Sequence, residues 1–228
     1  MLVYGKNVAI EVFNKNIKVK KIYIQENFDS NFIKDINRYS VTVLKKHEMD
    51  KKFKGLHQGI ALDIEDYKYT DINSFKFNDS LVVMLDHLED PHNFGAIIRT
   101  CEAAGVDLII IPEDRSVSIN STVIKTSVGT LFNVKIAKVK NLVNTINYLK
   151  KNGFWIVGTD MQGTDYAKID YKGNTCIICG NEGTGMSRLV RENCDFIATI
   201  NMLGEVNSLN ASVATGIILF EAIKNRRG

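Results

Sequence analysis

The second half of the chain contains six short runs that are almost continuously apolar, and this feature constrains the fold more than any other. Strands with one solvent-facing side alternate apolar and polar residues, whereas continuous apolar runs belong to strands that are buried on both faces. Helical patterns lie between the runs, so the sequence predicts an α/β fold with a parallel sheet covered by helices on both faces. Strands are expected at residues 80–88, 106–112, 132–139, 154–160, 174–180 and 196–200, and helices at 93–105, 120–131, 140–153, 185–194 and 209–227.

The N-terminal part of the chain shows shorter elements and predicts a separate, compact α/β unit. Helical spacing of apolar residues occurs at 5–15, 30–39 and 47–53, and short strand patterns occur at 20–25, 41–44 and 57–65. The stretch that follows is polar and has no clear period, which is typical of a linker. We therefore expect a small domain at residues 1–65, a linker at 66–79 and a larger domain at 80–228.

Positive charge is concentrated in the N-terminal part. Residues 1–60 hold 12 Lys and Arg against 6 Asp and Glu, whereas residues 61–228 hold 17 against 20. This asymmetry fits either a polyanion-binding module or a solvated lysine-rich surface. No apolar run reaches the roughly 18 residues that a membrane span needs, and no signal-peptide pattern opens the chain, so we expect a cytoplasmic protein without membrane contact.

The cysteine and histidine patterns do not predict a metal site. Cys176 and Cys179 form a C-x-x-C inside a predicted strand, where side chains three apart point to opposite faces. Four reduced, buried thiols are the expectation. His87 and His92 flank one turn, but no convincing third ligand lies nearby.

Ligands of open parallel sheets bind beyond the carboxyl ends of the strands, so the polar loops after the strands are the candidate sites. In the loop after the first strand of the larger domain, Asn93 is placed to cap a helix that begins near Phe94. Arg99 follows in the second turn, in a chain with seven Arg against 22 Lys. A planar, permanently charged guanidinium suits phosphate binding. The alternative for Arg99 is a surface ion pair with Glu102.

Two further loops are candidates. Gly180 to Ser187 is one residue from the phosphate-binding P-loop pattern, but Met186 stands where the lysine belongs, which disfavours nucleotide hydrolysis. That loop offers a closely approachable backbone and one carboxylate, Glu182. The loop before the last helix carries Ser208 and Asn210, and it holds more polar groups than one helix cap requires.

Taken in order, the segments NFGAIIR, GNEGTGM and MLGEVNSLNASVA resemble the three motifs of the SpoU/TrmH family, 2′-O-ribose RNA methyltransferases of the SPOUT superfamily. The N-terminal unit, with YGKNVAIEVF and HQGI, resembles the ribosomal-L30e-like substrate-binding domain of the subgroup that modifies 23S rRNA. The resemblance implies a deep trefoil knot, S-adenosylmethionine as methyl donor, a homodimer and an RNA substrate, for which a guanosine of 23S rRNA is the subgroup's usual target. It implies cofactor contacts at Gly180, Ile200 and Leu209, with Gly158, Thr159, Asn181, Gly183, Met202 and Ala211 as neighbours.

The same resemblance implies the catalytic groups. Arg99 resembles the family's catalytic arginine, and Asn93, Glu182, Ser208 and Asn210 match its other polar positions. An ordinary guanidinium, with a pKa above ~12, cannot accept a proton, so Arg99 is expected first to hold an RNA phosphate and stabilise alkoxide charge; a phosphate-assisted role as base stays open. The third motif usually begins Ile-Pro-Met, and Asn201 in place of the proline implies a softer adenine pocket.

Three alternatives stay open at this stage. The chain could be a tRNA 2′-O-methyltransferase of the same family, a non-catalytic RNA-binding or assembly factor with the same fold, or a nucleotide-binding α/β protein. The set of five polar site residues argues against the second, and Met186 argues against the third.

Overall fold

The computed structural model describes all 228 residues, which divide into two compact units. The first unit comprises Met1–Lys68 together with Ile119–Phe132, and the second comprises Tyr69–Ser118 and Asn133–Gly228. Ile119–Phe132, which the sequence placed in the larger domain at 80–228, thus belongs to the first unit.

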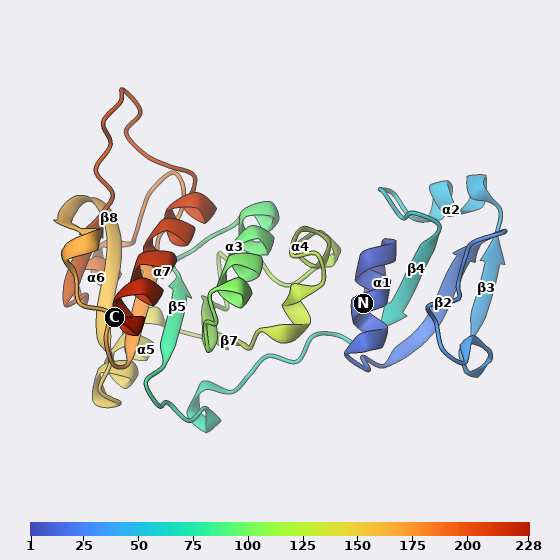
Figure 1. Ribbon diagram of the computed structural model, residues 1–228, viewed down its shortest axis with the longest axis horizontal. Helices are drawn as coiled ribbons and strands as arrows, with labels where there is room; N and C mark the ends of the chain where they lie inside the picture. Colours follow the sequence, from blue (N-terminus) through green and yellow to red (C-terminus); the bar gives the residue numbers. More distant parts are fainter. The chain divides into compact units, whose positions relative to one another are not determined.

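The first unit is built on a four-stranded sheet of order β1-β4-β2-β3, in which β2 and β3 are parallel and the other neighbours antiparallel (Figure 1). Its core includes Met49, Phe53 and Ala61, packed against Tyr23. The strands are β1 (Leu2–Tyr4), β2 (Val19–Gln25), β3 (Val41–Leu44) and β4 (Ile60–Ile64), and the helices are α1 (Lys6–Asn14), α2 (Lys46–Lys52) and α4 (Ser121–Thr126).

Two sequence predictions for this unit need correction. The helix predicted at 30–39 is only a short 3-10 turn at Ile36–Arg38, preceded by Asp35 in a left-handed conformation with φ 51°. The left-handed conformation of Asp35 interrupts the segment, so no helix extends over it, although the Asp29 carboxylate accepts a hydrogen bond from the backbone N–H of Asn31 at 3.2 Å. Strand β1 was not predicted, because its three residues gain their strand partner only from β4, some 60 residues on.

The second unit holds a six-stranded, all-parallel sheet of order β10-β8-β9-β5-β6-β7, as the apolar runs predicted (Figure 1). Every residue of β5, β6 and β9 is buried, as expected for strands covered on both faces. The strands are β5 (Leu81–Leu85), β6 (Leu108–Pro112), β7 (Ile136–Val139), β8 (Trp155–Asp165), β9 (Thr175–Cys179) and β10 (Phe196–Thr199), and the helices are α3 (Pro91–Ala103), α5 (Leu142–Lys151), α6 (Arg188–Glu192) and α7 (Ala211–Arg227).

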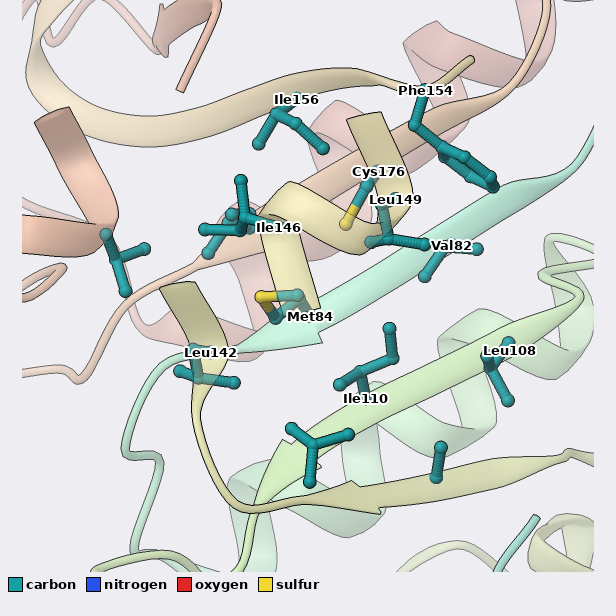
Figure 2. Close-up of a cluster of buried hydrophobic side chains, with 14 of the residues drawn as sticks. Val82, Met84, Leu108, Ile110, Leu142, Ile146, Leu149, Phe154, Ile156 and Cys176 are labelled. Atoms are coloured by element: carbon teal, nitrogen blue, oxygen red, sulfur yellow. The ribbon is translucent and has the colours of Figure 1, made fainter. Parts of the chain in front are cut away.

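Helices cover both faces of this sheet. On one face, side chains of the central strands pack against α5, where Ile146 and Leu149 are fully buried (Figure 2). The other face meets α7, because the hydroxyl of Thr215 on α7 contacts the Cys179 thiol at 3.1 Å, and Cys179 points away from Cys176 in the first cluster. Burying each of these aliphatic side chains contributes about 1.5–3 kcal/mol, so the sheet is a rigid platform for the loops at its ends.

Helix α3 begins earlier than the sequence predicted. Asp90, not Asn93, is the N-cap: its carboxylate accepts hydrogen bonds from the backbone N–H groups of His92 at 3.0 Å and Asn93 at 3.4 Å, and Pro91 occupies the first helical position. Proline fits there because its missing N–H would have no partner within the helix. The Asn93 side chain is therefore free for contacts outside the helix.

The state of the cysteines, the arrangement of potential metal ligands and the lengths of the helices complete the description of the fold. All four cysteines are free. The structure contains no group of three or more His, Cys, Asp or Glu side chains arranged to hold a metal ion. None of the helices combines the length and the apolar character needed to cross a membrane.

Candidate active site

A cavity of about 810 Å³ lies beyond the carboxyl ends of β9 and β10, beside the start of α7. This is the edge at which parallel sheets bind ligands. Its walls come from the end of β8, the glycine-rich loop after β9, and the long loop between β10 and α7. Eight of the nine residues proposed for the cofactor line it: Thr159, Gly180, Asn181, Gly183, Ile200, Met202, Leu209 and Ala211.

Gly158 is the ninth of these residues, and it does not line the cavity. A Cβ at this position would lie 2.6 Å from the Sγ of Cys194 and 2.7 Å from the Cε of Met186. The absence of a side chain there lets Cys194 and Met186, on either side of α6, pack closely against β8.

The glycine-rich loop after β9 is a tight backbone structure. Asn181 and Gly185 exchange two backbone hydrogen bonds of 3.1 and 2.9 Å, and the Asn181 side chain accepts a third from Gly183 N–H at 2.9 Å. A Cβ on Gly180 would lie 2.3 Å from the carbonyl carbon of Gly185 and from the nitrogen of Met186. Only glycine permits this approach, which keeps the loop closed where it lines the cavity.

Asp86 and His87 fasten this loop to the end of β5, and sequence reasoning missed both. The Asp86 carboxyl, 1% exposed, accepts a hydrogen bond from Ser187 N–H at 2.6 Å and is also bonded to Nδ1 of His87. The carbonyl of His87 in turn accepts a hydrogen bond from the Asn181 side chain at 3.0 Å. A carboxylate directly after a buried strand was the available signal, but spacing alone does not reveal its partner a hundred residues later.

Three polar residues that lie far apart in the sequence form one hydrogen-bonded chain of side chains. The Asn93 side-chain amide donates to the Glu182 carboxylate, and the Asn210 amide donates to the Asn93 carbonyl oxygen at 2.9 Å. The side-chain oxygen of Asn210 caps α7 by accepting a hydrogen bond from Ser212 N–H at 2.9 Å. The predicted dual role of this segment, as helix start and as part of a polar site, therefore has a geometric basis. Glu182 lines the cavity, so this hydrogen-bonded chain of side chains lies at the edge of the cavity.

The last two residues predicted for the site differ in their placement. Ser208 is exposed and lines the cavity. Arg99 is exposed on α3 and does not line it, and it forms no hydrogen bond or ion pair within the chain. The alternative partner, Glu102, instead accepts a hydrogen bond from Asn133 at 3.0 Å. The guanidinium of Arg99 is therefore free to bind an anion.

Two groups of the cavity wall, the Cys179 thiol and the Asp160 carboxyl, have shifted pKa values. Burial raises the pKa of Cys179 to about 11, against smaller opposing hydrogen bonds from Thr215 and Thr159, so the thiol stays neutral and is a poor nucleophile. Burial would also raise the pKa of Asp160, but a hydrogen bond from Arg191 at 2.7 Å and one from Met161 N–H outweigh it and hold that pKa below its ordinary value. The cavity thus has an ionised carboxylate and no reactive cysteine.

Fold and cavity together define a parallel-sheet α/β protein with a ligand site built from backbone and amide groups, joined to a basic N-terminal unit. Comparison with known proteins identifies the class. Residues 80–220 match the SpoU rRNA Methylase family, and residues 2–70 match the RNA 2′-O ribose methyltransferase substrate-binding domain. The chain belongs to the SpoU/TrmH family of RNA methyltransferases, as its three motifs predicted.

Relatives extend over nearly the whole chain. A Staphylococcus saprophyticus protein named as a TrmH family tRNA/rRNA methyltransferase is 41% identical over 239 residues, which cover 99% of this chain and 96% of the relative. An AdoMet-bound rRNA methyltransferase from Sinorhizobium meliloti superimposes with a TM-score of 0.85 at 27% identity, covering 98% of this chain and 86% of the other. The A. aeolicus TrmH/SpoU tRNA modifying enzyme gives 0.61 at 37% identity, over 66% of this chain and 77% of that one.

Proposed function

We propose that this protein transfers the methyl group of S-adenosylmethionine to the 2′-hydroxyl of a ribose in RNA, with a guanosine of 23S rRNA as the first candidate target. The observation that carries the proposal is the hydrogen-bonded chain of Glu182, Asn93 and Asn210 at the edge of the cavity. It joins one side chain from each of the three motifs.

The cavity residues fit S-adenosylmethionine in size and chemistry. A volume of about 810 Å³ lies in the ordinary range of ligand sites. Half-buried Ile200, Met202 and Leu209 offer apolar surface for an adenine ring, while the Glu182 carboxylate favours positively charged groups. When bound, the cofactor supplies an electrophilic methyl group.

The polar residues hold the reacting groups in line. Methyl transfer forms a bond from the ribose oxygen to the methyl carbon, breaks the bond from that carbon to sulfur, and releases the hydroxyl proton. Asn93, Asn210 and Ser208 would orient the ribose and Glu182 by hydrogen bonds, because the reaction requires an aligned approach at near-contact distance. Arg99 would hold the neighbouring phosphate and stabilise negative charge that develops on the oxygen.

A homodimer is part of this proposal. Helix α7 exposes Val213 and Phe220, 50% and 53% accessible, which lie seven residues apart on one helix face. Exposed apolar stripes of this kind favour self-association. Helix α3 packs against α7, as the 3.6 Å from an ideal Gly216 Cβ to the Thr100 methyl group indicates. A dimer built on this face would place Arg99 at the interface.

Two structural expectations belong to the same proposal. We propose that the loops around the cavity and α7 form a deep trefoil knot, supported by the match of residues 80–220 to the SpoU rRNA Methylase family. We also propose an L30e-like, RNA-binding role for the N-terminal unit, supported by its excess of Lys and Arg and by the matched substrate-binding domain. An experimental structure of the dimer tests the knot and the place of Arg99.

The activity is tested by incubating the purified full-length chain with tritiated S-adenosylmethionine and either rRNA or tRNA. Transfer to rRNA supports the first candidate, and transfer to tRNA alone supports the alternative that the A. aeolicus enzyme represents. Binding of RNA without transfer to either class would favour an assembly factor.

A further inference from the structure

A second cavity, of about 620 Å³, lies wholly within the first unit. Two loops form most of its wall: residues 25–29, at and after the end of β2, and residues 55–59, directly before β4. Lys6 at the start of α1 and Lys46 and Asp50 of α2 complete it. We refer to it as the N-terminal pocket.

The backbone of both loops turns through positive φ angles. Asn27 and Gln58 adopt left-handed φ angles of 61° and 52°, and Gly55 and Gly59 have φ angles of 138° and 80°. Glycine adopts such angles freely and asparagine readily, whereas the left-handed conformation costs Gln58 about 1–2 kcal/mol. Strain of this kind persists only where the surroundings impose it, and it gathers at ligand sites.

Specific contacts impose this conformation. His57, 7% exposed, bonds to the Asp50 carboxylate through Nε2 at 2.8 Å and accepts a hydrogen bond from Gly59 N–H at Nδ1 at 3.0 Å. The acceptor role of Nδ1 fixes the tautomer, so Nε2 donates its proton to Asp50. Gly59 O accepts from Gln25 N–H at 2.8 Å, and the Gln58 side chain accepts from Lys6 N–H at 2.9 Å. The loop is thus tied to α1, α2 and β2.

This rigid loop presents apolar surface to solvent. Leu56 lines the pocket and is 64% exposed. The Phe28 ring lies against the backbone of Gly59, where an ideal Cβ would be 2.7 Å from its Cδ2. A flat, half-buried ring beside an exposed aliphatic side chain offers the kind of surface on which an unpaired base stacks.

The charges around the N-terminal pocket select what enters it. Glu26, Asp29 and Asp50 line it, and these carboxylates would repel a phosphate while accepting hydrogen bonds from the N–H groups of a base. The exposed ammonium groups of Lys6 and Lys46 can neutralise phosphates on either side.

We propose that the N-terminal pocket holds one unpaired nucleobase of the RNA substrate, with the flanking phosphates on Lys6 and Lys46. The inference rests on the proposed function for the identity of the ligand as RNA. It adds that recognition requires a loop, bulge or other unpaired nucleotide, and that duplex RNA of the same composition is a poor ligand.

The test uses the full-length chain and an RNA hairpin with 2-aminopurine at an unpaired loop position, compared with a fully paired duplex. Leu56→Ala removes the exposed apolar contact, and Val43→Ala is the matched control, because Val43 on β3 is 57% exposed and lies outside the pocket. We expect Leu56→Ala to weaken hairpin binding about 5–10-fold, Val43→Ala to change it less than twofold, and the 2-aminopurine fluorescence to change on binding of the wild type.

Lys46→Ala should reduce the slope of log affinity against log salt by about 0.7. The comparison is Lys20→Ala, because Lys20 is an exposed lysine on β2 that lies outside the pocket. Equal binding of duplex and hairpin, or unchanged hairpin binding by Leu56→Ala, overturns the inference. Methyl transfer is measured on the same variants. Loop-selective, Leu56-dependent binding without any transfer contradicts the proposed enzyme alone, and transfer that Leu56→Ala leaves intact contradicts the pocket alone.

Discussion

Gly180→Ala gives a quantitative test of the glycine-rich loop. The added Cβ would lie 2.3 Å from backbone atoms of Gly185 and Met186, against an ordinary contact of about 3.4 Å or more, so the two strands of the loop must separate by about 1 Å. Both atoms belong to the backbone and cannot rotate away. Overpacking of this kind costs about 1–3 kcal/mol, which corresponds to a loss of about 5–150-fold in affinity for a ligand that needs the closed loop.

Isothermal titration with S-adenosylmethionine measures this loss, and thermal unfolding measured alongside shows how much of the cost falls on stability. Gly183→Ala is the comparison within the same loop, because its Cβ would meet only the Asn181 oxygen at 3.5 Å, an ordinary contact. We expect the Gly183 variant to lose a few-fold at most. Equal affinities for the Gly180 variant and the wild type would refute the reasoning.

Three further predictions concern other parts of the site. Arg99→Ala should abolish methyl transfer and leave S-adenosylmethionine binding within about twofold, since Arg99 lies outside the cavity; titration beside a tritium-transfer assay checks this, and near-normal transfer refutes the role. In Asp86→Asn neither Ser187 N–H nor His87 keeps a charged acceptor, and one of them faces the side-chain NH2 group; the change should cost about 1.5–3 kcal/mol, seen as a drop in unfolding midpoint of about 3–12 °C together with weaker cofactor binding, and an unchanged midpoint contradicts it. Asp160 has a lowered pKa in the folded state, so its ion pair with Arg191 stabilises the fold above the unfolded-state pKa of about 4, and this stabilisation is lost as pH falls through the folded-state pKa. Asp160→Asn should therefore be less stable than wild type at pH 7, and the difference in stability should shrink by pH 3. A stability difference that stays constant with pH would contradict the assignment.

The sheet of the second unit could be predicted from the sequence because its strands are buried on both faces, and such strands consist almost entirely of apolar residues. The prediction of a helix at 30–39 was wrong because Asp35 adopts a left-handed conformation in the middle of that segment, which apolar spacing does not reveal. Asn93 was predicted as a cap because it precedes the first apolar helical residues, whereas Asp90 and Pro91 start the helix one turn earlier. Cap preference is a local rule, and it cannot choose between two acceptors three residues apart.

The site itself depends on contacts that no local pattern contains. The bonds of Asn93 to Glu182 and Asn210 join residues 89 and 117 positions apart, and only the resemblance to a known family placed the three together in advance. Asp86 and His87 were not predicted as site residues, because sequence spacing does not reveal the distant partner of a carboxylate that follows a buried strand, and the left-handed Gln58 of the N-terminal pocket leaves no mark in composition or period. Sequence spacing predicts which loops meet at the sheet edge, and side-chain geometry decides what they do there.

The central claim is tested most directly by the chemical identity of the product. RNA incubated with the purified chain and S-adenosylmethionine is digested to nucleosides and analysed by mass spectrometry, beside RNA treated with Arg99→Ala. The account predicts one nucleoside that gains a methyl group on its ribose, at the 2′-oxygen, and only with the wild-type protein. Methyl groups on a base, or equal ribose methylation by both proteins, would contradict it.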